Sequence, residues 1–257
     1  MYIIADIGRY FLLLSANTGR LVNFIVAAII GAVKPPYYTQ TITQQIIFIG
    51  YNSLPVVGMM AIFSGAVLAL QSYTGFSRFS AEGSIATIVV LSITRELGPV
   101  LTGLMVSGRV GASIAAEIGT MRVTEQIDAL RTLSTQPIKY LVTPRIIASI
   151  IVMPLLVLVA DVIGVMGGYF VSVYKLGFNP ANYIANTKEH LEFIDVFSGL
   201  VKALIFGAII SIIGCFFGYF SEKGAQGVGK ATTGAVVTSS ILILLSNYII
   251  TELFFSK

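Results

Sequence analysis

The sequence holds 257 residues, of which 56% are hydrophobic and 11% are charged, and its mean hydropathy is +0.88. Soluble domains average about 25% charged residues, and several apolar runs in this chain exceed the roughly 18 residues that cross a bilayer. The composition therefore predicts an all-α, polytopic integral membrane protein with a single domain, 1–257, and leaves no room for a soluble one. The formal net charge of +4 requires no nucleic-acid partner, because membrane proteins gather Lys and Arg on their cytoplasmic side.

The first 34 residues are moderately apolar but interrupted by polar and charged side chains. Their apolar run, 21–33, is too short to cross a bilayer, and the sequence KPP directly after it ends the run. We expect an interfacial helix that lies in the membrane plane over 1–34; a short first span is the alternative. Residues 37–50 (YYTQTITQQIIFIG) form a polar lead-in to the membrane bundle.

Five apolar stretches are predicted to cross the membrane as a bundle over 51–255. Their ranges are 51–71, 83–107, 145–174, 193–219 and 232–255. Lys and Arg gather in the N-terminal segment and in the connections after the second and fourth spans. Because these residues mark the cytoplasmic side, we expect the N-terminus in the cytoplasm and, after five crossings, the C-terminus in the periplasm.

The cytoplasmic connection 108–144 contains a compact charged segment, EIGTMRVTEQIDALRTL, at 117–133. At 100° per residue, Val123, Ile127 and Leu130 share one face of a helix, and the charged side chains lie on the other side. The spacing therefore predicts an amphipathic cytosolic helix between the second and third spans.

Two i,i+3 ion pairs, Arg122–Glu125 and Asp128–Arg131, would support this helix. It has two interpretations: a helix that rests on the membrane surface, or a helix that docks into a soluble partner. The spacing alone favours neither.

Charged residues also occur inside the predicted spans: Arg95 and Glu96 in the second, Asp161 in the third, Lys202 in the fourth and Glu252 in the fifth. A charge at the centre of a bilayer costs at least about 2.5–3.5 kcal/mol, so each should face a partner or a cavity. Either these charges pair and fix helix packing, or they form a polar patch in a ligand cavity.

The segment GAQGVGKA, 224–231, nearly matches a phosphate-binding P-loop, but Ala231 occupies the position that needs Ser or Thr for Mg²⁺. It also follows an apolar span, so we interpret it as a Gly-rich turn. The chain has one cysteine, Cys215, and one histidine, His190, which indicates neither a metal site nor a catalytic cluster. We expect no cofactor in this chain.

The run RELGPVLTGLMVSGRVGASIAAEIGTMRVTEQIDAL, 95–130, resembles the signature of the MlaE/YrbE permeases, the membrane subunits of ABC transporters that move lipids with MCE-domain proteins. Pro137, Pro144, Lys202 and the GKATTGAVVTSS stretch before the fifth span extend the resemblance over roughly residues 50–250. Residues 1–45 match in character only. The resemblance implies a homodimeric transport subunit that is not itself an enzyme, with ATP and Mg²⁺ on two copies of a separate ATPase subunit.

The resemblance further implies that the protein lies in the bacterial inner membrane. It would shift phospholipid between that membrane and a periplasmic MCE-domain hexamer, which maintains the lipid asymmetry of the outer membrane. In this family the segment 117–133 is the coupling helix. The resemblance therefore implies ATPase contacts from Glu117, Arg122, Glu125, Gln126 and Asp128. It also implies a lipid cavity lined by Leu68, Leu70, Gln71, Tyr73, Arg95, Glu96 and Lys202. Asp161 and Glu252 match no family position and are interpreted as structural.

Two other function classes fit part of the sequence. A secondary transporter driven by protonation of Glu96 would carry an internal repeat with broken helices, and the sequence has no such repeat. A membrane anchor that only holds an MCE protein would need no charges inside the membrane. ATP dependence in proteoliposomes separates the first alternative from an ABC transporter, and lipid export after charge reversal at Glu96 tests the second.

Overall fold

The computed structural model describes residues 2–77 and 82–256, with side chains throughout except those of 2–14, 17 and 82. Residues 78–81 of the predicted connection 72–82, and Lys257, lie outside the described residues. Within the described ranges every regular element is a helix, which confirms the all-α class.

The chain order begins with α1 (Tyr2–Val33), followed by a first long helical unit of α2 (Thr39–Gly50), the 3₁₀ turn η1 (Tyr51–Ser53) and α3 (Leu54–Phe76). The second unit contains η3 (Glu82–Ser84), α4 (Ile85–Ser92), the π-helical turn η4 (Ile93–Leu97), α5 (Gly98–Val106), the π-helical turn η5 (Ser107–Gly111) and α6 (Ala112–Val123). The short α7 (Gln126–Thr132) comes next. The third unit is η6 (Ile138–Val142), α8 (Thr143–Phe170) and η7 (Val171–Lys175), and α9 (Pro180–His190), α10 (Phe193–Tyr219) and α11 (Ala225–Phe255) complete the chain.

Five helical units are long and apolar enough to cross a membrane, which confirms the predicted number of spans. They cover Thr39–Phe76, Ile85–Val123, Ile138–Lys175, Phe193–Tyr219 and Ala225–Phe255. Four of the five extend beyond the hydropathy-based ranges, and the expected polar lead-in is itself helical. The reason is that Gln and Thr are compatible with a helix, so hydropathy marks the apolar part of a span while the helix continues into polar residues.

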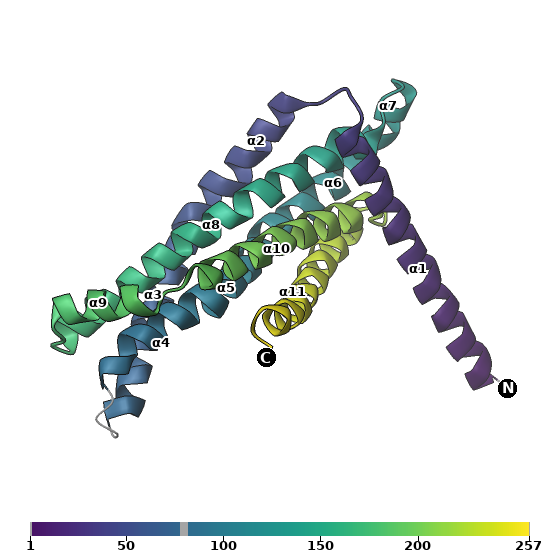
Figure 1. The fold of residues 1–257 in the computed structure, drawn as a ribbon. Coiled ribbons are helices and arrows are strands. Elements are labelled where there is room, and N and C mark those ends of the chain that lie inside the picture. The colour runs from purple at the N-terminus through teal and green to yellow at the C-terminus, as the bar shows by residue number, and fades with distance from the viewer. Residues whose placement is uncertain (1, 78–81, 257) are drawn as a thin grey trace.

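The central helix of the bundle is α8, which packs against α3 on one side and α10 on the other (Figure 1). Small residues make these crossings close. A Cβ added at Gly65 of α3 would overlap the backbone carbonyl of Gly164 in α8, and one at Gly207 of α10 would lie 2.6 Å from the carbonyl of Ser149. Close approach of this kind requires glycine, so these glycines fix the packing of three spans.

The helix α1 stands away from the bundle along most of its length (Figure 1). Its C-terminal part contacts the other helices: Phe24 is 2% exposed, and its ring lies 5.7 Å from those of Phe216 and Tyr219. Thr143 Oγ1 also donates to the carbonyl of Ala28 at 3.2 Å. The apolar portion of α1 is thus anchored on the bundle end that carries α7, and its interfacial location stays a prediction.

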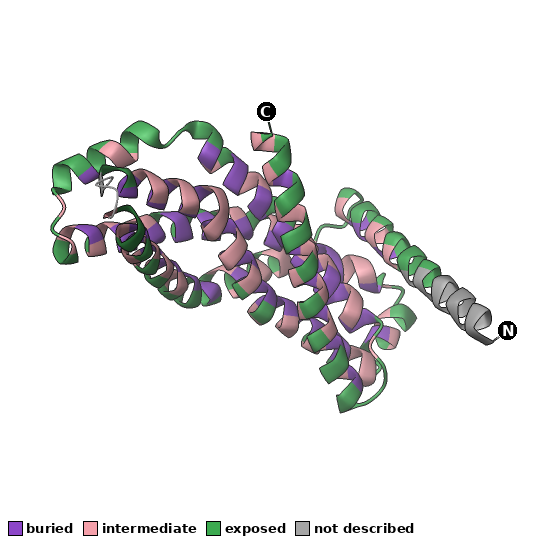
Figure 2. Cartoon of the chain, turned by 90° about the horizontal axis from the view of Figure 1, so that it is seen from below, coloured by how far each residue is buried: buried purple, intermediate pink, exposed green. Residues whose placement is uncertain are grey.

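Burial is uneven among the five spans (Figure 2). In the most apolar stretch of each unit, 28% of residues are buried in Thr39–Phe76 and 22% in Ala225–Phe255, against 44–50% in the other three. The first and fifth spans therefore present most of their surface to lipid or to another protein.

Candidate functional site

The π-helical turn η4 positions two of the predicted site residues, Arg95 and Glu96. Proline follows shortly after this turn, and Pro99 has no N–H to offer the carbonyl of Arg95 four residues earlier. Lys202 Nζ of α10 donates to that carbonyl at 2.7 Å. A backbone acceptor that the sequence frees inside the membrane is thus satisfied by a lysine from another span.

Glu96 is the centre of a polar network that joins three spans. Its Oε1 lies 2.8 Å from Lys202 Nζ and accepts from Thr251 Oγ1 at 2.8 Å, and its Oε2 accepts from Asn247 Nδ2 at 2.8 Å. The Lys202 side chain is fully buried, whereas the Glu96 side chain is 37% exposed. The structure therefore brings the charges of the second and fourth spans together, and Asn247 and Thr251 of α11 join them.

Arg95 pairs with a residue that the sequence interpretation missed, Asp195. Arg95 Nε lies 2.6 Å from Asp195 Oδ1, and the Arg95 guanidinium lies 4.5 Å from the centre of the Phe255 ring. Asp195 is fully buried, and its Oδ2 also accepts from the backbone N–H of Glu192 at 3.0 Å, which caps the start of α10. The seven-residue spacing of Asp195 and Lys202 places both on one face of a helix and is the signal that could have found it.

The predicted cavity residues of α3 lie on the other side of the same turn. Leu68 and Tyr73 are half-buried against a small apolar cluster of Ala69, Ile85, Val89 and Ile93, and Ile93 is the first residue of the turn η4. Leu70 is also half-buried and Gln71 is exposed. The structure thus brings Arg95, Glu96 and Lys202 together and links them to the α3 residues through Ile93; lipid binding by the seven residues stays a prediction.

The predicted helix over 117–133 is divided in two. Helix α6 continues the second span to Val123, and α7 begins at Gln126, because Glu125 adopts a left-handed conformation with φ of 59°. The expected Arg122–Glu125 pair is therefore wrong: Arg122 Nη1 binds Asp128 Oδ1 at 3.0 Å instead. The expected Asp128–Arg131 pair forms at 3.3 Å.

On the predicted apolar face of this segment, Ile127 is fully buried, and Val123 and Leu130 are half-buried. Arg131 Nη2 donates to the Tyr219 hydroxyl at the end of α10 at 2.7 Å, and this contact raises the pKa of the Arg131 guanidinium. Glu125 and Gln126 are exposed at the bend. The bend is thus attached to the bundle on one side and open to a partner on the other.

Glu117 has a different position from Glu125 and Gln126. It lies within α6, and Oε1 binds Arg145 Nη2 at 2.8 Å, where the Arg145 side chain is 4% exposed. Glu117 therefore braces the second span against the start of α8, and its exposed edge is the only part that a partner could reach.

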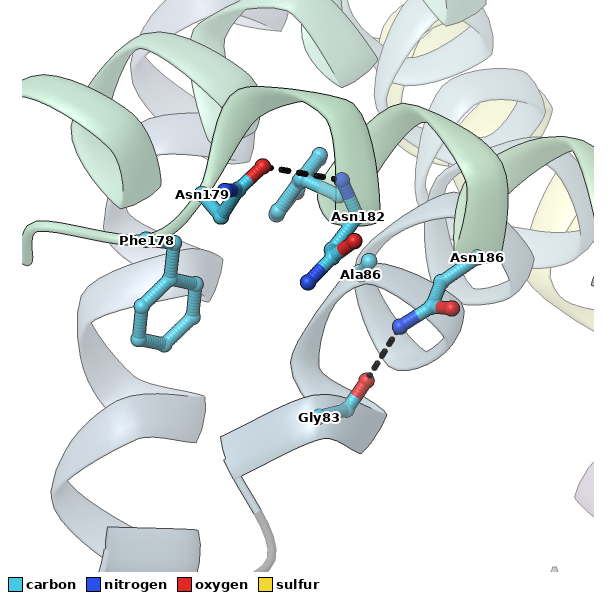
Figure 3. Close-up of a pocket in the computed structure, with 7 residues that line it drawn as sticks. Gly83, Ala86, Phe178, Asn179, Asn182 and Asn186 are labelled. Atoms are coloured by element: carbon cyan, nitrogen blue, oxygen red, sulfur yellow. Dashed lines mark hydrogen bonds between the residues drawn. The ribbon is translucent and has the colours of Figure 1, made fainter.

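At the opposite end of the bundle, an open cavity of about 140 Å³ lies between α9 and the start of the second span, and three asparagines are among its lining residues (Figure 3). Asn186 Nδ2 donates to the carbonyl of Gly83 at 3.2 Å, and Asn179 accepts from the backbone N–H groups of Ala181 and Asn182. Burial raises the pKa of Tyr183, which lines the same cavity. These contacts hold α9 on the start of the second span.

The P-loop-like segment 224–231 is largely helical, since α11 begins at Ala225. Lys230 Nζ lies 3.2 Å from Glu222 Oε2, and both side chains are 73% exposed. Lys230 thus forms a surface ion pair at the α7 end of the bundle.

The family model of the permease MlaE matches residues 42–253 of this chain. The chain belongs to the MlaE permease family. It is 68% identical over 250 residues to a probable ABC transporter permease protein of Rickettsia bellii, which covers 97% of this chain and 96% of the relative. A probable ABC transporter permease protein of Synechocystis is 43% identical over 212 residues, 82% of this chain and 81% of the relative.

A third relative is the intermembrane phospholipid transport system permease protein MlaE of Haemophilus influenzae. It is 33% identical over 238 residues, which covers 92% of this chain and 91% of the relative. The polar network, the bent segment and all five spans lie within the matched range 42–253, apart from the first residues of α2 and the last of α11. The protein is therefore an ABC transporter permease of the MlaE family.

Proposed function

We propose that this MlaE-family permease moves phospholipid between the bacterial inner membrane and a periplasmic MCE-domain hexamer, and so maintains the lipid asymmetry of the outer membrane. The observation that carries the proposal is the network of Arg95, Glu96 and Lys202. The buried partners Asp195 and Lys202 pair with Arg95 and Glu96, whose side chains remain 34% and 37% exposed. A charged edge beside apolar helix faces matches a lipid, which joins a charged headgroup to acyl chains.

Two copies of the chain would enclose this edge. On α3 the exposed apolar residues Val56, Met59, Phe63 and Val67 follow a helical spacing along one face. Helix α11, which donates to Glu96, presents a second such face with Val237, Ile241, Leu244 and Tyr248. A homodimer that pairs these faces would form a cavity bounded by the network and by Leu68, Leu70, Gln71 and Tyr73.

The ATPase subunit that an ABC transporter permease requires would dock at the bend between α6 and α7. Glu125 and Gln126 are exposed there, while Ile127 and the Arg131–Tyr219 contact fix the bend to the bundle. A rigid attachment of this kind transmits motion from a docked ATPase to the second and fourth spans. Two ATPase copies, with their ATP and Mg²⁺, would serve the dimer.

The same assignment gives the orientation in the membrane. An ATPase at α7 puts that end of the bundle in the cytoplasm, in agreement with the excess of Lys and Arg there. The end with α9 then faces the periplasm and the MCE partner. A reporter that is active only in the periplasm, fused after Lys257, should be active; activity of a cytosolic reporter alone at that position would contradict the orientation.

Lipid crosslinking tests the proposed substrate. A photoreactive residue at Leu70 should crosslink phospholipid in the reconstituted transporter, and Glu96→Ala or Lys202→Ala should reduce both crosslinking and ATP-dependent lipid transfer. If the network only fixes packing, the double variant Glu96→Gln/Lys202→Met should recover transfer, since it removes both charges. Recovered transfer in that double variant would overturn the lipid-binding role.

The rival secondary transporter makes a different prediction for the same experiment. Lys202 and Asn247 each already direct an N–H group at one oxygen of Glu96, so a proton on either oxygen would face an N–H donor. Transfer that depends on ATP and persists without a proton gradient supports the ABC transporter. Transfer driven by the gradient alone would support the rival.

A further inference from the structure

Asp161 is a buried acid that the polar network does not include. It lies in α8 and is 7% exposed, and among the described residues its Oδ1 is buried without a hydrogen-bond partner. The other buried aspartate, Asp195, binds Arg95 and a backbone N–H. A buried polar group without a partner is costly, so the state of Asp161 needs a separate explanation.

The carboxyl of Asp161 lies against the turn η4. A Cβ added at Gly98 would overlap Asp161 Oδ1 and would lie 2.8 Å from the carbonyl oxygen of Ile93. The missing side chain of Gly98 therefore lets the carboxyl approach a backbone acceptor. The Ile93 carbonyl already accepts from the N–H of Gly98, but a carbonyl has two lone pairs and can accept a second donor.

Among the described residues, no unpaired cation on the helices around Asp161 balances a charge on its carboxyl. Helices α2, α3, α4 and α5 contain no charged residue. The charged groups of α10 and η4 pair among themselves, as Asp195 with Arg95 and Lys202 with Glu96. The remaining charged residues of described elements near α8 lie toward its ends or on α9: Lys139, Arg145, Lys175, Lys188, Glu189 and His190.

Asp161 also borders an apolar groove of about 290 Å³ on the outer side of α8. Its other lining residues carry no charge and include Val90, Thr94, Leu158 and Val162. Burying an isolated carboxylate in such surroundings costs far more free energy than burying a neutral carboxylic acid, which can also donate a hydrogen bond. Leu158 and Val162 are exposed on the surface of the bundle, so a lipid-soluble reagent would reach the carboxyl through this groove.

We propose that Asp161 is a proton-binding site within the membrane. In this conformation the carboxyl holds a proton taken up from water, and the protonated oxygen donates to the carbonyl of Ile93. The bond connects the third span to the turn that carries Arg95 and Glu96, so a motion that separates α8 from this turn returns the proton to water. The inference does not depend on the substrate of the permease.

Modification by a membrane-permeant carbodiimide tests the proposal, because the reagent reacts with the protonated carboxyl group and enters from the lipid. The full-length permease in proteoliposomes is treated at several pH values, and the modified residues are identified by mass spectrometry. Asp161 should be modified at neutral pH and progressively less as the pH rises. Glu96 is a matched control: it is more exposed but ion-paired, and it should remain unmodified.

Infrared spectroscopy gives a readout that does not require reagent access. Wild type should show the carbonyl band of a protonated carboxylic acid, and Asp161→Asn should lose it while Glu96→Gln keeps it. Identical spectra for wild type and Asp161→Asn would overturn the proposal. Protection of Asp161 from carbodiimide by Na⁺ or K⁺ at constant pH would also overturn it, in favour of a metal-cation site.

Discussion

Lys202 Nζ lies 2.8 Å from Glu96 Oε1, and the Lys202 side chain is fully buried while the Glu96 side chain is 37% exposed. The two partners are therefore not equivalent. Without Lys202, Glu96 keeps its donors Asn247 and Thr251 and some contact with the exterior. Without the Glu96 charge, Lys202 keeps one backbone carbonyl and remains buried.

This asymmetry predicts the stability of single variants. Glu96→Gln should lower the free energy of unfolding by roughly 3–5 kcal/mol, because it leaves a buried charge uncompensated. Lys202→Met should lower the free energy of unfolding by less. The double variant Glu96→Gln/Lys202→Met should have a free energy of unfolding close to that of wild type. Thermal unfolding of the purified permease in detergent measures the order.

The control for that series is Lys230→Met, which removes an ion pair with Glu222 in which both side chains are 73% exposed. Exposed pairs contribute about 0–1 kcal/mol, so this variant should unfold near wild type. If Lys230→Met lowered the free energy of unfolding as much as Glu96→Gln does, burial of the charge would not be the reason for the loss of stability.

Asp195 has two functions that two substitutions can separate. Asp195→Asn keeps an oxygen for the Glu192 N–H but removes the charge next to Arg95, whereas Asp195→Ala removes both contacts. Because a lost N-terminal cap costs about 1 kcal/mol, Asp195→Ala should unfold at a lower temperature than Asp195→Asn. Equal unfolding temperatures would show that the cap contributes nothing, and Asp128→Asn in a half-exposed pair is the control.

Much of the bundle could be predicted from the sequence, because apolar length sets the number of spans and charges in a span must find partners. That reasoning anticipated five spans, and it gave pairing among the intramembrane charges as one of two alternatives. It missed Asp195, although this acid lies at the first turn of α10 and inside the predicted span 193–219. The partners on α11, Asn247 and Thr251, are uncharged and therefore gave no signal.

The bend at Glu125 could not be predicted for a different reason. The left-handed conformation usually requires Gly or Asn, and Glu gives no indication of it, so the regular helical spacing predicted one helix. Once the chain bends there, the i,i+3 register across the bend is lost. Arg122 then reaches Asp128, six residues later, instead of Glu125.

Charge at the bend should control ATPase association. Glu125→Lys should weaken copurification of the ATPase about tenfold or more, because a like charge in a complementary interface costs several kcal/mol. Insertion in the membrane should be unchanged. Glu189→Lys, an exposed reversal on α9 at the opposite end, is the matched control, and an equal effect of both reversals would contradict docking at the bend.

Glu125→Gly separates backbone conformation from charge. Glycine adopts a positive φ without the cost of about 1–2 kcal/mol that other residues bear, so this variant should be at least as stable as wild type. ATPase copurification should nevertheless fall, since the carboxylate is gone. Normal copurification with Glu125→Gly would show that the bend, and not the charge, is what the ATPase recognises.

The crossing of α3 and α8 should be sensitive to a single methyl group. A Cβ at Gly65 would overlap the backbone carbonyl of Gly164, and a backbone atom cannot move aside as a side chain can. Gly65→Ala should therefore separate the helices and lower the free energy of unfolding by about 1–3 kcal/mol, the usual cost of overpacking. Gly75→Ala is the matched control in the same helix, because a Cβ there meets nothing within 4 Å and alanine favours helix by about 1 kcal/mol. Thermal unfolding should show opposite shifts for the two variants, and a stabilising Gly65→Ala would mean that α3 and α8 do not cross this closely.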